Sequence, residues 1–161
     1  MIEFLARLVS RAAPTLSQAD ARDAASFAAL HAAAFPRGWS EDEFERLLTD
    51  RIVVAHRAIA SGRIAGFVLT RLAADQAEIL SIAVAASWRG RGLGRRLIDL
   101  HLRRLAAFGV KALFLEVDDA NAPARRLYAR SGFYEVGRRG AYYPQASGPP
   151  SAALVLRRDL A

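Results

Sequence analysis

The 161-residue sequence contains no cysteine. Disulfide bonds, zinc–thiolate centres and a cysteine nucleophile are therefore excluded. Long hydrophobic runs are also missing, because no stretch approaches the ~20 apolar residues of a membrane-spanning helix. Residues 1–9 are too short and carry the wrong charges for a secretory signal, so the cytoplasm is the expected location.

Lysine is almost absent, since Lys111 is the only one among 23 basic residues. The formal net charge is nevertheless +7, and the isoelectric point is about 10.9. Such a charge favours anionic partners such as nucleotides or ribosomes. The excess of arginine and alanine also resembles a codon bias, so the charge is weak evidence for nucleic-acid binding.

The composition predicts one globular domain over residues 1–161, with 53% hydrophobic and 24% charged residues. Residues 1–13 form a possible short extension, either a helical turn or two against the body or a frayed terminus. The periodicity predicts strands at 14–19, 52–60, 64–72, 77–85, 112–117, 133–139 and 152–158, helices at 20–33, 41–48, 92–108 and 121–130, and an irregular loop at 140–150.

The crossover from the 77–85 strand through the 92–108 helix makes that strand parallel to the 112–117 strand. The other strands are expected to be antiparallel. The predicted fold class is α/β of the α+β type, with a mixed, mostly antiparallel, twisted sheet of about seven strands and helices on both faces.

A glycine-rich turn at residues 89–94, with the sequence RGRGLG, separates that strand from the long helix. Glycines permit positive φ and a close backbone approach, and a helix N-terminus offers free N–H groups to phosphate oxygens. The arginines of the turn and of the first helical positions add charge and forked donors. The sequence therefore predicts a phosphate-binding turn. Three-glycine patterns are weak on their own, and a dinucleotide-binding turn is the nearest rival.

The turn resembles the Q/R-x-x-G-x-G/A signature of the GNAT superfamily of N-acetyltransferases. The resemblance implies that it holds the pyrophosphate of acetyl-coenzyme A, the expected co-substrate. It also implies that the two parallel strands splay apart and that the pantetheine arm lies against the first of them. The coenzyme-binding residues implied are Ile82, Ala83, Val84, Arg89, Gly90, Arg91, Gly92, Leu93, Gly94, Arg95 and Asn121.

Glu116 stands in an otherwise apolar strand, where a bare buried carboxylate would be costly. It either faces a cleft, where it can act as a base, or forms a structural salt bridge with one of the many arginines. Tyr128 is either a core residue of the following helix or a proton donor for a thiolate. Asn121 is a candidate N-cap of that helix.

The segment from Leu115 to Phe133 resembles the RimI-type ribosomal-protein-alanine N-acetyltransferases through the pattern L-E-V-x-x-x-N-x-x-A-x-x-L-Y-x-x-x-G-F. This resemblance, which spans roughly residues 16–156, implies that Glu116 is the proton acceptor, directly or through water, and that Tyr128 is the general acid. It also implies that the acceptor site is flanked by the first two helices. No metal site is expected.

The segment RRGAYYP at residues 138–144 resembles the R-R-x-Y-Y-P segment of the same family, with one additional residue. Tyr142 and Tyr143 are therefore candidates for gripping the acceptor, and Trp39 is a possible wall residue; a hydrophobic lid and core packing are the alternatives. Two departures concern the acceptor: Asp118 replaces a residue often basic in the family, and 149–151 reads PPS in place of acidic residues.

These observations predict direct acetyl transfer in a ternary complex to the N-terminal α-amine of a ribosomal protein. One alternative is a small-molecule amine acetyltransferase on the same fold. The other is a non-catalytic basic module associated with the ribosome or with nucleic acid. Neither a membrane nor direct binding to nucleic acid is required by the favoured reading.

Overall fold

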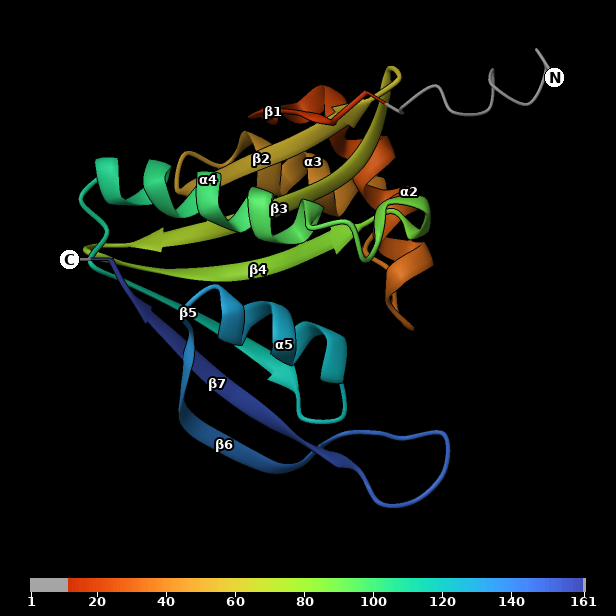
Figure 1. Cartoon of the computed structure of the whole chain (residues 1–161), viewed down its shortest axis with the longest axis vertical. Coiled ribbons are helices and arrows are strands. Elements are labelled where there is room, and N and C mark those ends of the chain that lie inside the picture. The colour runs from red at the N-terminus through yellow and green to blue at the C-terminus, as the bar shows by residue number, and fades with distance from the viewer. Residues whose placement is uncertain (1–11, 161) are drawn as a thin grey trace, which may run out of the picture.

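The computed structural model describes residues 12–160, and the extension expected over residues 1–13 lies almost wholly outside them. Seven strands form one sheet in the order β1-β2-β3-β4-β5-β7-β6, with helices on both faces (Figure 1). The predicted α/β fold class is confirmed. The elements are β1 (Thr15–Gln18), η2 (Ala21–Asp23), α2 (Ala24–Ala34), α3 (Glu41–Thr49), β2 (Val53–Ala60), β3 (Arg63–Ala73), β4 (Gln76–Val84), η3 (Ala86–Trp88), α4 (Leu93–Ala107), β5 (Ala112–Asp118), α5 (Ala122–Arg130), β6 (Tyr134–Tyr143) and β7 (Ser151–Asp159).

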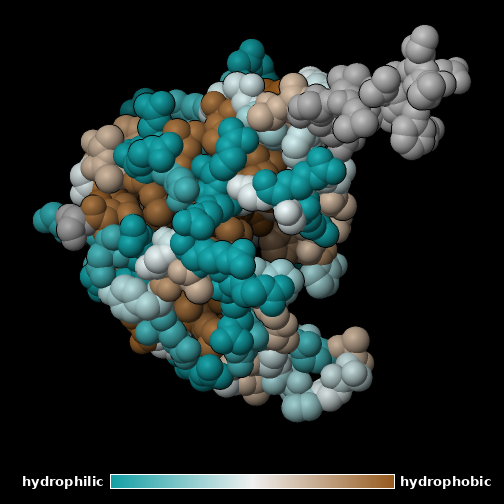
Figure 2. Space-filling view, viewed as in Figure 1, coloured by the Kyte–Doolittle hydropathy of each residue, from teal (hydrophilic) through white to brown (hydrophobic). Residues whose placement is uncertain are grey.

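The parallel pair β4 and β5 separates soon after it starts. Only three residue pairs are in register, from Gln76 opposite Ala112 to Glu78 opposite Phe114. Beyond them β5 pairs only with β7, so the remainder of β4 lacks a strand partner on that side among residues 12–160. Figure 1 shows the resulting wedge, and Figure 2 shows a hollow between the turn after β4 and the β6–β7 loop.

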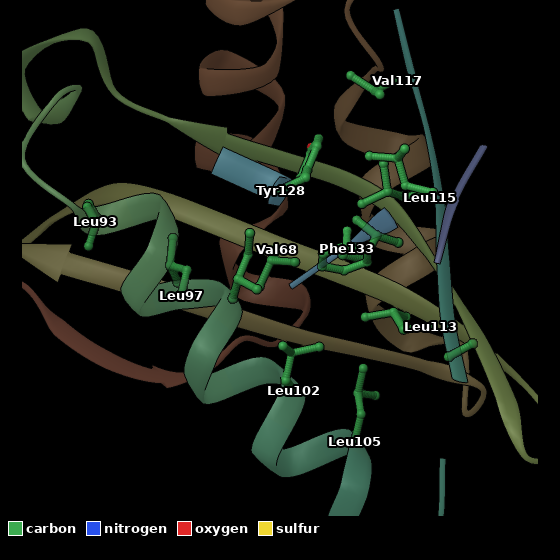
Figure 3. Packing of buried hydrophobic residues seen from close by; sticks show 14 of the residues in the cluster. Val68, Leu93, Leu97, Leu102, Leu105, Leu113, Leu115, Val117, Tyr128 and Phe133 are labelled. Atoms are coloured by element: carbon green, nitrogen blue, oxygen red, sulfur yellow. The ribbon is translucent and has the colours of Figure 1, made fainter. Parts of the chain in front are cut away.

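Two apolar cores lie on opposite faces of the sheet. The larger packs α4 and α5 onto the sheet, with Leu97, Leu105 and Leu113 fully buried (Figure 3). The smaller lies under α2 and α3, where Phe27, Phe44 and Phe67 form stacked and edge-on ring contacts. Both faces of the central strands are therefore covered, which explains their nearly continuous apolar sequences.

The helix ends follow the predicted signals. Ser40 and Glu43 form a reciprocal capping box at the start of α3, and Asn121 caps α5 through the N–H of Ala124. Gly109, with φ of 87°, ends α4 as predicted. No helix among residues 12–160 is long and apolar enough to cross a membrane.

One boundary prediction is wrong. The irregular loop expected over residues 140–150 begins later, because β6 continues to Tyr143. Between Arg139 and Tyr143 the strand advances four residues while its partner advances two, from Ala153 to Ser151. Ala141 takes a positive φ of 53° within this irregularity. The alternating pattern does not indicate the bulge, and Gly140 within it is equally typical of a loop, so the strand continuation could not be read from the sequence.

A buried polar chain joins α4 to the sheet. The Nδ1 atoms of His56 and His101 are 2.7 Å apart, and Nε2 of His101 is 2.6 Å from the hydroxyl of Thr70. All three side chains are at most 4% exposed. Burial lowers the pKa of His56 to about 4, with Arg104 nearby, and burial together with His56 lowers the pKa of His101 to about 3. The folded protein therefore holds both imidazoles neutral.

We predict that stability declines as the pH falls from 7.5 to 5. The unfolded histidines take up protons near pH 6.5 while the folded ones do not, so the free energy of unfolding should fall by about 2 kcal/mol for each histidine, or about 4 kcal/mol for the pair. Urea denaturation at several pH values measures this change. In His101→Gln, which keeps hydrogen-bonding atoms but does not titrate, the decline should be shallower. If the free energy of unfolding falls equally with pH in the two proteins, the buried histidine pair is not the cause of the decline.

Candidate active site

The glycine turn connects the free end of β4 to α4. Gly90 and Gly92 have φ of 71° and 79°, and a Cβ placed on either would meet no atom within 4 Å. Gly92 is the N-cap of α4 in the left-handed conformation and offers no side-chain cap. The first N–H groups of α4 are therefore available to an anion, which adds to the favourable electrostatic field of the helix N-terminus.

The arginines predicted for this turn do not all have the same environment. Arg89 is exposed and donates from Nε to the carbonyl oxygen of Val84 at 3.1 Å. The guanidinium of Arg91 lies 5.4 Å from the ring centroid of Trp88. Arg95 is exposed on the first turn of α4. These three side chains give the open turn its positive charge, which suits a phosphate ligand.

Leu93 and Gly94 hold the turn against the core. Leu93 is 2% exposed, and a Cβ on Gly94 would lie 3.1 Å from the Leu127 side chain of α5. Gly66 of β3 permits a similar approach, because its Cβ would lie 3.0 Å from Leu97. The predicted residues Leu93 and Gly94 thus position the turn by packing, while Gly90 and Gly92 shape its open surface.

Ile82, Ala83 and Val84 form the last part of β4, on the edge that faces the wedge. The side chains of Ile82 and Val84 pack against the larger core, and Ala83 is buried in the smaller one. Peptide groups on this edge have no β-strand partner toward β5 among the described residues. They can therefore pair with an extended ligand, as the resemblance implied for the pantetheine arm.

Glu116 lies across the wedge on β5, on the face that carries α2 and α3. Its side chain is 26% exposed, and its Oε1 is 3.2 Å from Nη2 of Arg139 on β6. Within residues 12–160 this is the only ion pair that the Glu116 side chain forms. The structure therefore combines the two readings left open by the sequence, because the carboxylate is paired with an arginine and also reaches solvent.

Tyr128 is buried in α5 at 7% exposure, edge-on to Phe133. Burial, and to a smaller extent Tyr143, raises the pKa of Tyr128 well above 10. The pKa of Tyr143 is raised in turn by burial and then by the Glu116 carboxylate. Tyr143 therefore lies within electrostatic reach of both residues, and we refer to these three residues as the Glu116–Tyr143–Tyr128 cluster.

The cluster shows what the sequence reasoning missed. Tyr143 was expected only to grip an acceptor, and Arg139 was not singled out among the basic residues. The motif RRGAYYP contained both, but the fold was needed to place them beside Glu116. Tyr142 is 49% exposed and packs edge-on to Tyr143, which leaves it available to a partner.

The two departures from the family pattern meet in space. The hydroxyl of Ser151 donates to Asp118, and the amide of Gln145 donates to Asp118 at 3.3 Å and to Ser151 at 2.7 Å. Partial burial would raise the pKa of Asp118, but hydrogen bonds from Ser151, the Ala120 N–H and Gln145 hold it below its usual value. Asp118 thus anchors the β6–β7 loop beside the cluster.

A hollow of about 430 Å³ lies between α3 and strands β3 and β4. Trp39, the predicted wall residue, is one of its lining residues, together with Leu47 and Leu80 and the charged Glu43, Arg46, Asp50 and Arg71. His31 holds Trp39 in place. The imidazole of His31 stacks on the Trp39 indole, and its Nδ1 accepts a 3.1 Å hydrogen bond from the backbone N–H of Trp39. No group of three potential metal ligands occurs among the described residues.

The turn offers a direct test of the coenzyme site. In Gly92→Ala, strain at positive φ and a methyl group on the open surface should weaken the affinity for coenzyme A about tenfold or more. Gly109→Ala is the matched control, since Gly109 has φ of 87° with no atom within 4 Å at the other end of α4. Calorimetric titration should show weaker binding of coenzyme A in Gly92→Ala only, although both variants should lose a similar amount of thermal stability. Equal affinities in the two variants would place the ligand elsewhere.

Known proteins share both the sequence and the fold. The model of the acetyltransferase (GNAT) family matches residues 24–133. The chain is 38% identical over 127 residues to the [ribosomal protein bS18]-alanine N-acetyltransferase of Salmonella typhimurium (76% of this chain, 80% of that protein). It is 35% identical over 122 residues to the protein of the same name from Escherichia coli K12, with the same coverage.

Solved structures agree with this relationship. The ribosomal-protein-S18-alanine N-acetyltransferase from Escherichia coli has a TM-score of 0.84 at 29% identity, over 91% of this chain and 94% of that one. NAA60 of Arabidopsis thaliana, in complex with a bisubstrate analogue, shares the fold with a TM-score of 0.81 at 20% identity, over 91% and 97%. Since the family model spans more than half of the sequence and the bacterial relatives exceed 30% identity, the chain belongs to the GNAT family of acetyltransferases.

Proposed function

We propose that this acetyltransferase transfers the acetyl group of acetyl-coenzyme A to the α-amino group at a protein N-terminus. The acceptor we propose is the N-terminal alanine of ribosomal protein bS18, which the names of the bacterial relatives specify for those proteins. The observation that carries the proposal is the wedge, because it places the open turn, the free edge of β4 and Glu116 around one opening. The cytoplasm is the location that fits such an acceptor.

In this proposal the coenzyme supplies the activated acetyl group as a thioester. The open turn at Gly90 and Gly92 and the start of α4 bind its phosphates. The edge of β4 from Ile82 to Val84, which has no strand partner on this side among residues 12–160, orients its arm toward the wedge. With no cysteine in the sequence, transfer takes place directly between the two bound substrates, and binding them side by side supplies much of the rate.

Glu116 is the group that we assign as the proton acceptor. An N-terminal α-amino group has a pKa of about 7.7–8.0, whereas a lysine side chain has about 10.4. A sizeable fraction of α-amine is therefore already neutral near pH 7, and a single carboxylate, directly or through water, suffices to take up its proton. The partial exposure of Glu116 leaves it accessible to such an amine.

Tyr128 is the group that we assign as the proton donor to the departing sulfur. Burial raises the pKa of its phenol, so the hydroxyl stays protonated at every pH at which the enzyme works. A buried donor also remains shielded from competing water. Asn121 supports this placement because it caps the helix that carries Tyr128.

The acceptor is expected to reach the wedge from the face that carries α2 and α3. Trp39 borders the hollow on this face, and Leu80 of β4 also lines it. Tyr142 is exposed at the far side, where β6 ends. Tyr142 is not among the residues that line the hollow, so an acceptor that contacts both Trp39 and Tyr142 has to be extended, as a peptide is.

Acetyl transfer to peptides tests the acceptor. A peptide that begins with the alanine-led sequence of bS18 should be acetylated at its α-amine, as mass spectrometry after incubation with acetyl-coenzyme A would show. A peptide of the same sequence with a blocked N-terminus and an internal lysine is the control, and it should remain unmodified. Transfer to small polyamines but to neither peptide would contradict the proposed acceptor and favour a small-molecule enzyme.

Two variants test the assigned roles. Glu116→Gln should lower kcat/KM for the peptide by about 10²-fold, since general-base catalysis contributes 10²–10⁴. Tyr128→Phe should lower kcat by about tenfold or more, because the leaving sulfur loses its proton donor. Glu135→Gln makes the same chemical change on exposed β6 and should have no effect. Full activity in both Glu116→Gln and Tyr128→Phe would show that the roles are assigned wrongly.

A further inference from the structure

We propose that Arg139 holds the position beside Glu116 that the acceptor's ammonium group takes on binding, and thereby sets which amines gain access to the base. This inference rests on the proposed function and assigns Arg139 as a specificity-determining residue of the same site. It starts from the ion pair between Arg139 Nη2 and Glu116 Oε1 at 3.2 Å.

The pair is poised to open. Arg139 and Glu116 form an ion pair in which both side chains keep some contact with solvent. The side chain of Arg139 is 58% exposed, so water solvates its charge when it leaves. An exposed pair of this kind contributes at most about 1 kcal/mol, which a second cation can match.

Arg139 also has an alternative contact close by. Its guanidinium carbon lies 5.5 Å from the ring centroid of Tyr142, within the range of a cation–π interaction. The register of β6 against β7 shifts between Arg139 and Tyr143, and both Glu116 and Tyr142 contact the same guanidinium. Arg139 can therefore release the carboxylate without losing every partner.

The other charged groups nearby are already occupied. Asp118, two residues along β5, accepts hydrogen bonds from Ser151, Gln145 and the N–H of Ala120. Arg157 of β7 pairs with Asp159 and lies over the ring of Phe114. Among residues 12–160, Arg139 is thus the one cation paired with Glu116, and an incoming ammonium has to compete with it.

The competition has a chemical consequence. An amine that arrives as a cation gains the Coulomb attraction of Glu116 when it displaces Arg139, and it then delivers its proton to that carboxylate. An uncharged group, such as the acetylated N-terminus of the product, gains nothing from Glu116 and leaves Arg139 in place. The charge of Glu116 therefore favours the substrate amine over the acetylated product, while Arg139 weakens the binding of every cationic amine by competing for the same carboxylate.

The experiment compares Arg139→Ala with Arg138→Ala. Arg138 is the matched control, because it is the adjacent arginine of the same strand and pairs with Glu135 and Asp119 instead. For an alanine-led peptide acceptor, Arg139→Ala should lower KM about three- to fivefold at low salt, the range of an exposed ion pair, with kcat within about twofold of wild type. Arg139→Lys should restore the wild-type KM, and Arg138→Ala should leave it unchanged.

Binding of the acetylated peptide supplies the second measurement. Calorimetry on the enzyme–coenzyme A complex should show equal affinity of wild type and Arg139→Ala for the Nα-acetylated peptide, while the free-amine peptide binds the variant more tightly. A KM that rises or stays the same in Arg139→Ala would overturn the inference, and so would an equal gain in affinity for the free-amine and the acetylated peptide. If the wild-type enzyme acetylates no peptide at all, the proposed function fails instead, which separates the two outcomes.

Discussion

The separation of β4 from β5 is the constraint on which the site depends. Strand pairing satisfies backbone groups, and here it stops after three residue pairs although both strands continue. Part of the cause lies in β4, whose register against β3 shifts near Leu80 so that one additional residue is accommodated. The remaining β4 edge is left for a ligand, and β5 pairs with β7 and carries the partly exposed Glu116.

Much of this arrangement could be predicted from local patterns. Apolar periodicity, the capping box at Ser40 and Glu43, and glycines such as Gly109 fixed the type and order of the elements, because each acts over a few residues. The parallel pair followed from the handedness of the crossover through α4. The wedge itself came only through resemblance, since no local rule indicates where two strands stop pairing.

The rest of the site depends on contacts between distant segments. The choice between a free and a paired Glu116 could not be made from β5 alone, because its partner Arg139 is 23 residues later in the sequence. Helix α5 lies between them, and Arg139 belongs to the bulged strand β6. The same holds for Asp118 and Ser151, which depart from the family pattern separately in sequence but share a hydrogen bond. The histidines His56 and His101 gave no sequence signal, as they lie 45 residues apart.

The wedge also divides the sheet into two parts. Strands β1–β4 pack with α2, α3 and α4, while β5–β7 carry α5, and within residues 12–160 strand pairing between the parts is limited to the three register pairs at one end. A ligand that lies along the β4 edge therefore adds backbone contacts between two sections that are otherwise joined mainly by side chains of the larger core. The resistance of this enzyme to proteolysis and to heat should thus rise with the concentration of coenzyme. When acetyl-coenzyme A is scarce, the enzyme itself should have a shorter lifetime.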